Sequence, residues 1–115
     1  ALAMAYWRRK PPAGLVHHSD RGSQYACDEY RKRLQQYGMV ASMSRKGDGW
    51  DNAPTERVFG SLKSERLSDY RFTTRRFAEL EVLDYIGYYN SIRLHSTLGY
   101  KSPMTYEKEL RRKAA

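Results

Sequence analysis

Two acidic residues stand at positions where carboxylates could do chemistry. Asp20 follows a short apolar run at residues 15–18, which predicts a buried strand. The carboxyl ends of strands in an open α/β sheet border the crevice in which ligands bind. Glu56 falls in the first turn of a helix expected later in the chain. Each acid also has a structural alternative, because Asp20 can close a turn before Gly22 and Glu56 can stabilise its helix while facing solvent.

A pair of carboxylates suits a divalent metal ion. Mg²⁺ prefers oxygen ligands and keeps several waters, so one or two carboxylates and a substrate phosphate suffice to hold it. Two such ions about 3.5–4 Å apart can stabilise the attacking and the leaving oxygen of an in-line displacement at phosphorus. The chain has 13 Asp and Glu residues, which form many pairs. Taken singly, Asp20 and Glu56 therefore fit their structural alternatives better.

The elements that would position these acids alternate between strand and helix. The patterns predict strands at 15–18 and 39–44, a loop at 45–52, and helices at 1–9, 23–37, 53–67, 75–92 and about 104–113. Strand, helix, strand and helix with short connections describe an α/β unit with parallel strands. Two strands make a poor sheet. We therefore expect the edge of the first strand to be covered by another copy, an exchanged element or a rearrangement.

Apolar residues at helical spacing are expected to form the core. The first of the longer helices carries them at Ala26, Tyr30, Leu34 and Tyr37, before Gly38 ends it. The later helices carry them at Val58, Phe59, Leu62, Phe77, Leu80, Leu83, Ile86 and Tyr89. The expected caps of these later helices are Asp51 or Asn52 and Thr73 or Thr74.

The composition points to a polyanionic partner. Lys and Arg number 21 against 13 Asp and Glu, a formal net charge of +8, and each neutralised phosphate of a nucleic acid releases counterions. A basic protein with no nucleic-acid role is the alternative. The single Cys27 excludes an internal disulfide, and no apolar run reaches the roughly 20 residues that cross a bilayer. We expect a cytoplasmic protein with no membrane partner, cut from a longer chain because it lacks an initiator Met.

Several long segments around these residues resemble one protein family. They are HHSDRGSQY at 17–25, SMSRKGDGWDNAPTE at 42–56 with FGSLKSE at 59–65, YYNSIRLH at 88–95 and LGYKSP at 98–103. Together they closely resemble the insertion-sequence-three family of bacterial transposases, whose catalytic subunit has a retroviral-integrase-type core. The resemblance covers nearly the whole chain.

The resemblance implies a helix-rich α/β chain with a ribonuclease-H-like fold, of which this is the C-terminal portion lacking the first strands. Residues 1–100 would belong to the integrase-type catalytic core and 101–115 would form a basic C-terminal tail. The family has an Asp, Asp, Glu triad with 35 residues between its last two members, the number that residues 21–55 supply. Asp20 is thus expected to be the second aspartate and Glu56 the glutamate. The first aspartate would lie upstream of Ala1.

The implied activity is cleavage at transposon ends followed by strand transfer, with two Mg²⁺ or Mn²⁺ ions held by Asp20, Glu56 and the missing aspartate. The expected partners are bacterial DNA, at transposon ends and target, and further copies of the chain. With two of three carboxylates, the isolated chain is expected to be inactive. Two alternatives stay open: a non-catalytic DNA-binding or assembly fragment, and a ribonuclease-H-like nuclease that cuts without joining.

Further residues are expected to contact DNA. Lys63 lies seven residues after Glu56, about 20° from the same helix face and roughly 10.5 Å along the axis. A solvated surface lysine is its alternative. Asn52 is either a helix N-cap or a hydrogen-bonding group of the active site.

The loop that carries Arg45, Lys46 and Trp50 resembles the mobile active-site loop of this fold. Its basic and aromatic residues suit contact with phosphates and bases, and an ordinary surface loop is the alternative. Arg93 and Lys101 stand among aromatic residues, as basic groups do on nucleic-acid surfaces. We expect both to contact DNA, and the neighbouring tyrosines to serve in packing.

Overall fold

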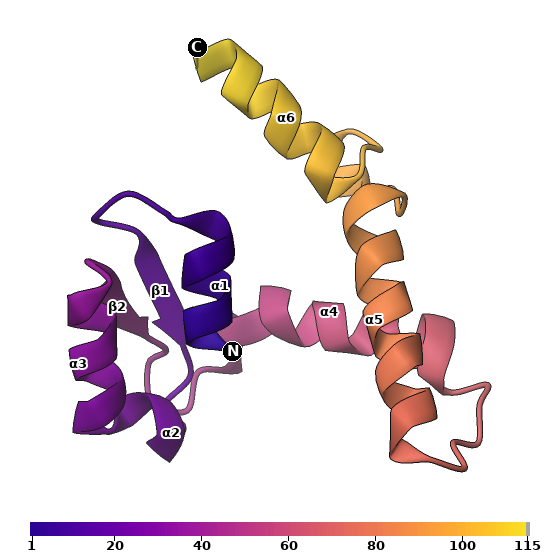
Figure 1. Ribbon diagram of the computed structural model, residues 1–115, viewed down its shortest axis with the longest axis horizontal. Coiled ribbons are helices and arrows are strands. Elements are labelled where there is room, and N and C mark those ends of the chain that lie inside the picture. The colour runs from indigo at the N-terminus through magenta and orange to yellow at the C-terminus, as the bar shows by residue number, and fades with distance from the viewer. Residues whose placement is uncertain (115) are drawn as a thin grey trace. The chain divides into compact units, whose positions relative to one another are not determined.

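The structure is a computed structural model that describes residues 1–114. It is rich in helix and holds one small sheet (Figure 1). The chain forms two compact units, Ala1–Glu56 and a second that begins at Arg57. None of the helices in the described part combines the length and the apolar character that a membrane crossing requires.

The first unit contains the sheet. Its elements are α1 (Leu2–Arg9), β1 (Val16–Ser19), α2 (Ser23–Ala26), α3 (Asp28–Gln36), β2 (Val40–Met43), the 3-10 turn η1 (Gly49–Asn52) and the start of α4 (Ala53–Leu62). β1 and β2 pair in parallel, with Val16 opposite Val40 and Ser19 opposite Met43. The strand, helix, strand and helix order and the parallel pairing confirm the prediction.

The helix expected over 23–37 is broken in two. Cys27 has an extended backbone, with φ −73° and ψ 153°, so α2 ends before it and α3 begins after it. Asp28 and Glu29 then occupy the first turn of α3, where acidic groups favour a helix start. Gly38 follows α3 with φ 68°, and its N–H bonds to the Gln35 carbonyl at 3.0 Å, which confirms its predicted role at the helix end.

The prediction of a buried first strand is wrong. Val16 is 59% exposed, while the side chains that alternate with it, at His17 and Ser19, are the half-buried ones. Successive strand residues point to opposite faces of a sheet, so β1 turns its polar face inward. Leu34 on α3 supplies the buried apolar residue of this unit at 3% exposure. The ring of Tyr37 stacks on that of Tyr6 in α1, 4.0 Å between centroids.

The second unit is helical. After the rest of α4 come the π-helical turn η2 (Lys63–Leu67), α5 (Arg75–Ser91), the 3-10 turn η3 (Ser96–Leu98) and α6 (Pro103–Ala114). The helix predicted to reach about residue 67 does so, with its last five residues in π geometry. Thr74 caps α5 as expected, because its Oγ1 accepts from the N–H of Phe77 at 3.1 Å.

Much of the apolar stripe predicted as core is exposed in this unit. Val58, Phe59, Leu80, Leu83 and Ile86 all lie among the exposed large apolar residues. Within the described part of the unit, α5 packs against η2 and α6, and these contacts leave the five residues uncovered. Tyr85 is the large side chain that is buried there, at 2% exposure.

Candidate active site and its loop

Asp20 lies directly after β1, at the carboxyl end of the strand. Its Oδ1 accepts a hydrogen bond from the Gly22 N–H at 2.7 Å, which closes the predicted turn. A Cβ on residue 22 would stand 2.9 Å from that oxygen, so the close approach depends on glycine. The turn fixes the orientation of an exposed carboxylate.

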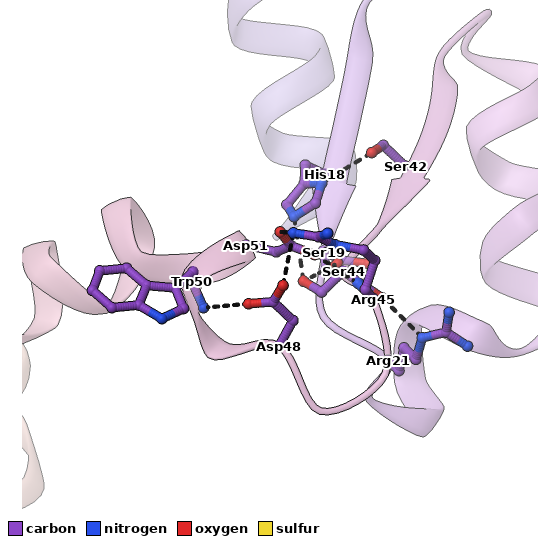
Figure 2. A network of polar contacts seen from close by, with 9 residues as sticks. All are labelled: His18, Ser19, Arg21, Ser42, Ser44, Arg45, Asp48, Trp50 and Asp51. Carbon is purple, nitrogen blue, oxygen red and sulfur yellow. Dashed lines mark hydrogen bonds and ion pairs between the residues drawn. The ribbon is translucent and has the colours of Figure 1, made fainter.

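Polar contacts tie the ends of the two strands together (Figure 2). The Arg21 Nε donates to the carbonyl of buried Ser44 at 2.8 Å. The Ser44 Oγ donates to the Ser19 carbonyl at 3.3 Å and lies 3.3 Å from the His18 Nε2. The other ring nitrogen of His18, Nδ1, lies 3.0 Å from the Ser42 Oγ. The segments that leave β1 and β2 therefore start from fixed positions.

Arg45 closes the loop that follows β2 onto itself. Its backbone N–H and Nε donate to the Asp51 Oδ2 at 2.8 and 3.2 Å, and its Nη2 donates to the Asp51 Oδ1 at 3.0 Å. The same Nη2 lies 2.7 Å from the Asp48 Oδ2. We call Arg45, Asp48 and Asp51 the loop clasp; Figure 2 shows its three side chains converging. The hydrogen bonds from Arg45 lower the pKa of Asp51 to about 2.

The sequence did not reveal the two acids of the clasp. Asp51 is one of the two residues predicted to cap the following helix, and no role is predicted for Asp48. The signal that could have found them is an Arg followed by Asp at three and six residues in a glycine-containing loop. The Arg45 guanidinium is paired with these two acids. Its contact with DNA stays a prediction.

Glu56 lines an open hollow on the first unit. The hollow has a volume of about 570 Å³ and is bordered by Gly47, Asp48, Gly49, Trp50, Ala53 and Glu56. The Glu56 carboxylate is exposed and makes no hydrogen bond or ion pair with any residue between 1 and 114. Trp50 stands beside it at 87% exposure. An unpaired acid and an uncovered aromatic ring thus share one concave surface.

The structure places both predicted acids in the first unit without a third ligand. Asp20 follows β1 and is not among the residues that line the hollow of Glu56. Within residues 1–114, no group of three His, Cys, Asp or Glu side chains is arranged to hold a metal ion. The described residues therefore offer two exposed carboxylates.

The other residues expected to contact DNA fall into two groups. Lys46 in the loop and Lys63 at the start of η2 are exposed, and neither forms an ion pair with a described residue. Asn52 ends η1, which runs directly into α4, and its side chain makes no hydrogen bond to residues 1–114. A DNA contact of these three residues stays a prediction.

Arg93 and Lys101 instead meet acids of the second unit. Arg93 holds Glu65 through three contacts of 2.7–2.9 Å, and Glu65 also accepts from the Tyr85 hydroxyl at 2.5 Å. The hydrogen bonds from Arg93 hold the pKa of Glu65 below its ordinary value. Burial, with the hydrogen bond to Glu65, raises the pKa of Tyr85 to about 12. Lys101 Nζ lies 2.5 Å from Glu109. The Tyr85–Glu65 contact joins α5 to η2, and the Lys101–Glu109 pair ties the segment before α6 to that helix. Contact of either cation with DNA stays a prediction.

Comparison with known proteins gives consistent matches. Two family models, each described as an integrase core domain, match residues 1–49 and 56–110. The 31 kDa protein of insertion element IS600 from Shigella sonnei is 49% identical over 100% of this chain and 43% of its own length. The transposase for insertion sequence element IS904 from Lactococcus lactis is 46% identical over 88% of the chain and 40% of its length.

A third relative is the transposase InsF for insertion sequence IS3A from Escherichia coli, 42% identical over 93% of the chain and 38% of its own length. The chain thus spans well under half of each of these relatives. No solved structure gives a significant match. The two domain matches together cover most of the chain, and the relatives agree with them. The chain therefore belongs to the integrase core domain family, among the transposases of insertion-sequence-three type.

Proposed function

We propose that the chain is part of a transposase core that cleaves DNA at transposon ends and joins the 3′-hydroxyl to another phosphodiester. The relatives named as transposases support this reaction class. Asp20 and Glu56 would be two of three carboxylates of the active site. The observation that carries the proposal is the unpaired Glu56 carboxylate, exposed in a hollow beside a loop of the transposase motif.

The proposed fold is the C-terminal portion of a ribonuclease-H-like core. The parallel β1–β2 pair supports it, because such a core contains a larger sheet to which these strands would add. The exposed Val16 and Val40 are apolar positions that further strands or another copy would cover. The division into a core at 1–100 and a basic tail at 101–115 is proposed on the same resemblance; α6 carries Arg111, Arg112 and Lys113 in its last turn.

The donor chemistry of the two acids fits a divalent metal. Both offer carboxylate oxygens, the ligands that Mg²⁺ and Mn²⁺ accept, and both are exposed. The Gly22 N–H orients Asp20, and the start of α4 positions Glu56. When bound, Mg²⁺ or Mn²⁺, as two ions in the complete site, would supply Lewis-acid stabilisation of charge on the phosphoryl oxygens.

A matched pair of variants tests the role of Asp20. In a longer form of the protein that restores the upstream residues, Asp20→Asn is expected to reduce Mg²⁺-dependent strand transfer by about 100-fold or more. Asp28→Asn, at an exposed acid of the same unit, should keep the activity. Gel analysis of joined products from end-sequence DNA measures both. Equal activity of the two variants would contradict the assignment of Asp20.

A second candidate applies to the chain taken alone, as a DNA-binding or assembly fragment without catalysis. It is favoured by the lack of any three-ligand group among residues 1–114. In the same assay the 115-residue chain should bind DNA and yield no joined product. Robust joining by this chain would overturn the requirement for a third carboxylate.

A further inference from the structure

We propose that Trp50 binds an unpaired nucleobase of the DNA by stacking, beside Glu56, and that the loop clasp of Arg45, Asp48 and Asp51 holds the indole in position. The inference rests on the proposed function, because it takes DNA as the ligand. It adds a base-binding site and a positioning role for Arg45, which the sequence had assigned to DNA contact.

The exposure of Trp50 leaves its indole free to contact a ligand. Its side chain is 87% exposed, so it contributes little apolar burial to the folded chain. It lies in a turn between two loop glycines and α4, and a Cβ on Gly47 or Gly49 would meet no atom within 4 Å. The space over the loop is therefore open to a planar group. Stacking on an aromatic side chain suits any base, because every base has a π-face.

The clasp fixes the backbone that carries Trp50. Arg45 binds Asp51 through both carboxylate oxygens and also meets Asp48. The other oxygen of the Asp48 carboxylate, Oδ1, accepts a hydrogen bond from the backbone N–H of Trp50 at 3.1 Å. Figure 2 shows the indole pointing away from this network. A backbone held in place before binding leaves less conformational freedom to be lost when a base stacks on the indole.

The charge of the hollow selects a base over a phosphate. Its lining contains two acids, Asp48 and Glu56, and no basic residue. Away from a metal ion held by Glu56, a phosphate would be repelled from this lining, whereas a neutral base is not. In a duplex the bases stack on one another, so only an unpaired base offers a free face to the indole.

The chain contains its own control, because it has two tryptophans. Trp7 on α1 is also strongly exposed, at 63%, and is not part of the hollow. Trp7→Phe leaves Trp50 as the only indole reporter, and Trp50→Phe leaves Trp7. Each variant is titrated with an oligonucleotide of unpaired bases and with a fully paired duplex, while fluorescence anisotropy of labelled DNA records binding separately.

Unpaired DNA should quench the fluorescence of Trp50 in the Trp7→Phe chain, and should leave that of Trp7 in the Trp50→Phe chain nearly unchanged. Trp50→Ala should weaken binding of the unpaired oligonucleotide by about 5- to 100-fold and change duplex affinity far less. Trp50→Phe keeps an aromatic face, so it should bind the unpaired oligonucleotide with most of the affinity that Trp50→Ala loses. In the Trp7→Phe background, Arg45→Gln should reduce the quenching of Trp50 at saturating DNA.

Three negative outcomes are distinguishable. DNA binding without quenching of Trp50, or with equal affinity in Trp50→Ala, overturns base stacking and leaves the proposed function intact. No binding of either DNA by anisotropy overturns both the inference and the proposed function. Full quenching in Arg45→Gln overturns the positioning role of Arg45 alone.

Discussion

At the scale of single residues, the cations that the sequence marks for DNA contact divide into two kinds. Arg45, Arg93 and Lys101 are paired with acids of their own unit. Lys46 and Lys63 form no ion pair with any described residue. An unpaired lysine meets a phosphate without first giving up a protein partner. Lys46 and Lys63 are therefore the stronger candidates for contact with the DNA backbone.

The helix and strand patterns did not predict these pairings. The acids that meet Arg45, Arg93 and Lys101 lie 6, 28 and 8 residues away along the chain. Helix and strand patterns report neighbours at spacings of about two to four residues. Longer separations depend on turns such as η2, whose π geometry no apolar pattern indicates. The motif around Arg93 predicted the family correctly while its physical role in the unit stayed hidden.

The loop clasp predicts a pH dependence that belongs to Asp51. Its pKa falls from 3.8 to about 2 in the folded chain, so the clasp stabilises the loop above pH 3.8 and is lost as the pH falls towards 2. In the Trp7→Phe chain, Trp50 fluorescence should change across this range. At neutral pH, the Asp51→Asn chain should already show the Trp50 fluorescence that the parent shows near pH 2. Asp28→Asn serves as the control and should titrate like the parent; an unchanged titration in Asp51→Asn would contradict the clasp.

At the scale of elements, the order of helices and strands followed from sequence, and their burial did not. Parallel β1 and β2, α5 with its Thr74 cap, and the end of α3 at Gly38 were predicted. The break at Cys27 was missed because the apolar spacing continues across it. The burial of a face depends on what packs against it, which a pattern within one helix or strand does not contain.

Tyr85 provides a test of how the second unit is held together. Its pKa is raised to about 12, mainly by burial, so the unit is stabilised below pH 10 and loses that stabilisation as the pH rises towards 12. Tyr85→Phe removes the hydrogen bond to Glu65 and should cost about 1 kcal/mol at neutral pH. Denaturant unfolding at several pH values, followed by near-ultraviolet circular dichroism, measures both effects.

Tyr88→Phe is the matched control, because Tyr88 is an exposed tyrosine of the same helix. The unfolding free energy of the Tyr88→Phe chain should fall between pH 10 and 12 as it does in the parent chain. The unfolding free energy of the Tyr85→Phe chain should fall less steeply. If Tyr85→Phe were as stable as the parent at neutral pH and equally sensitive to alkali, the Tyr85–Glu65–Arg93 connection would not stabilise the unit.

At the scale of the whole molecule, the net charge and the sequence motifs say more about the family of the chain than its fold does. The net charge of +8 left a basic protein without nucleic-acid function open, and the domain and transposase matches then gave the family. The exposed apolar residues of both units, among them Val16 and Leu83, describe surfaces suited to further packing. We propose that upstream strands or further copies cover them in the working enzyme.

The central claim is that Glu56 is a catalytic carboxylate, and one comparison tests it directly. Glu56 and Glu29 are both exposed acids in the first turn of a helix, so Glu29→Gln controls for the loss of a helix-stabilising charge. Strand transfer is measured with Mg²⁺ in the longer protein that carries the upstream residues. Glu56→Gln should reduce joined product by about 100-fold or more while Glu29→Gln stays near the parent. Equal activity in the two variants would contradict the claim.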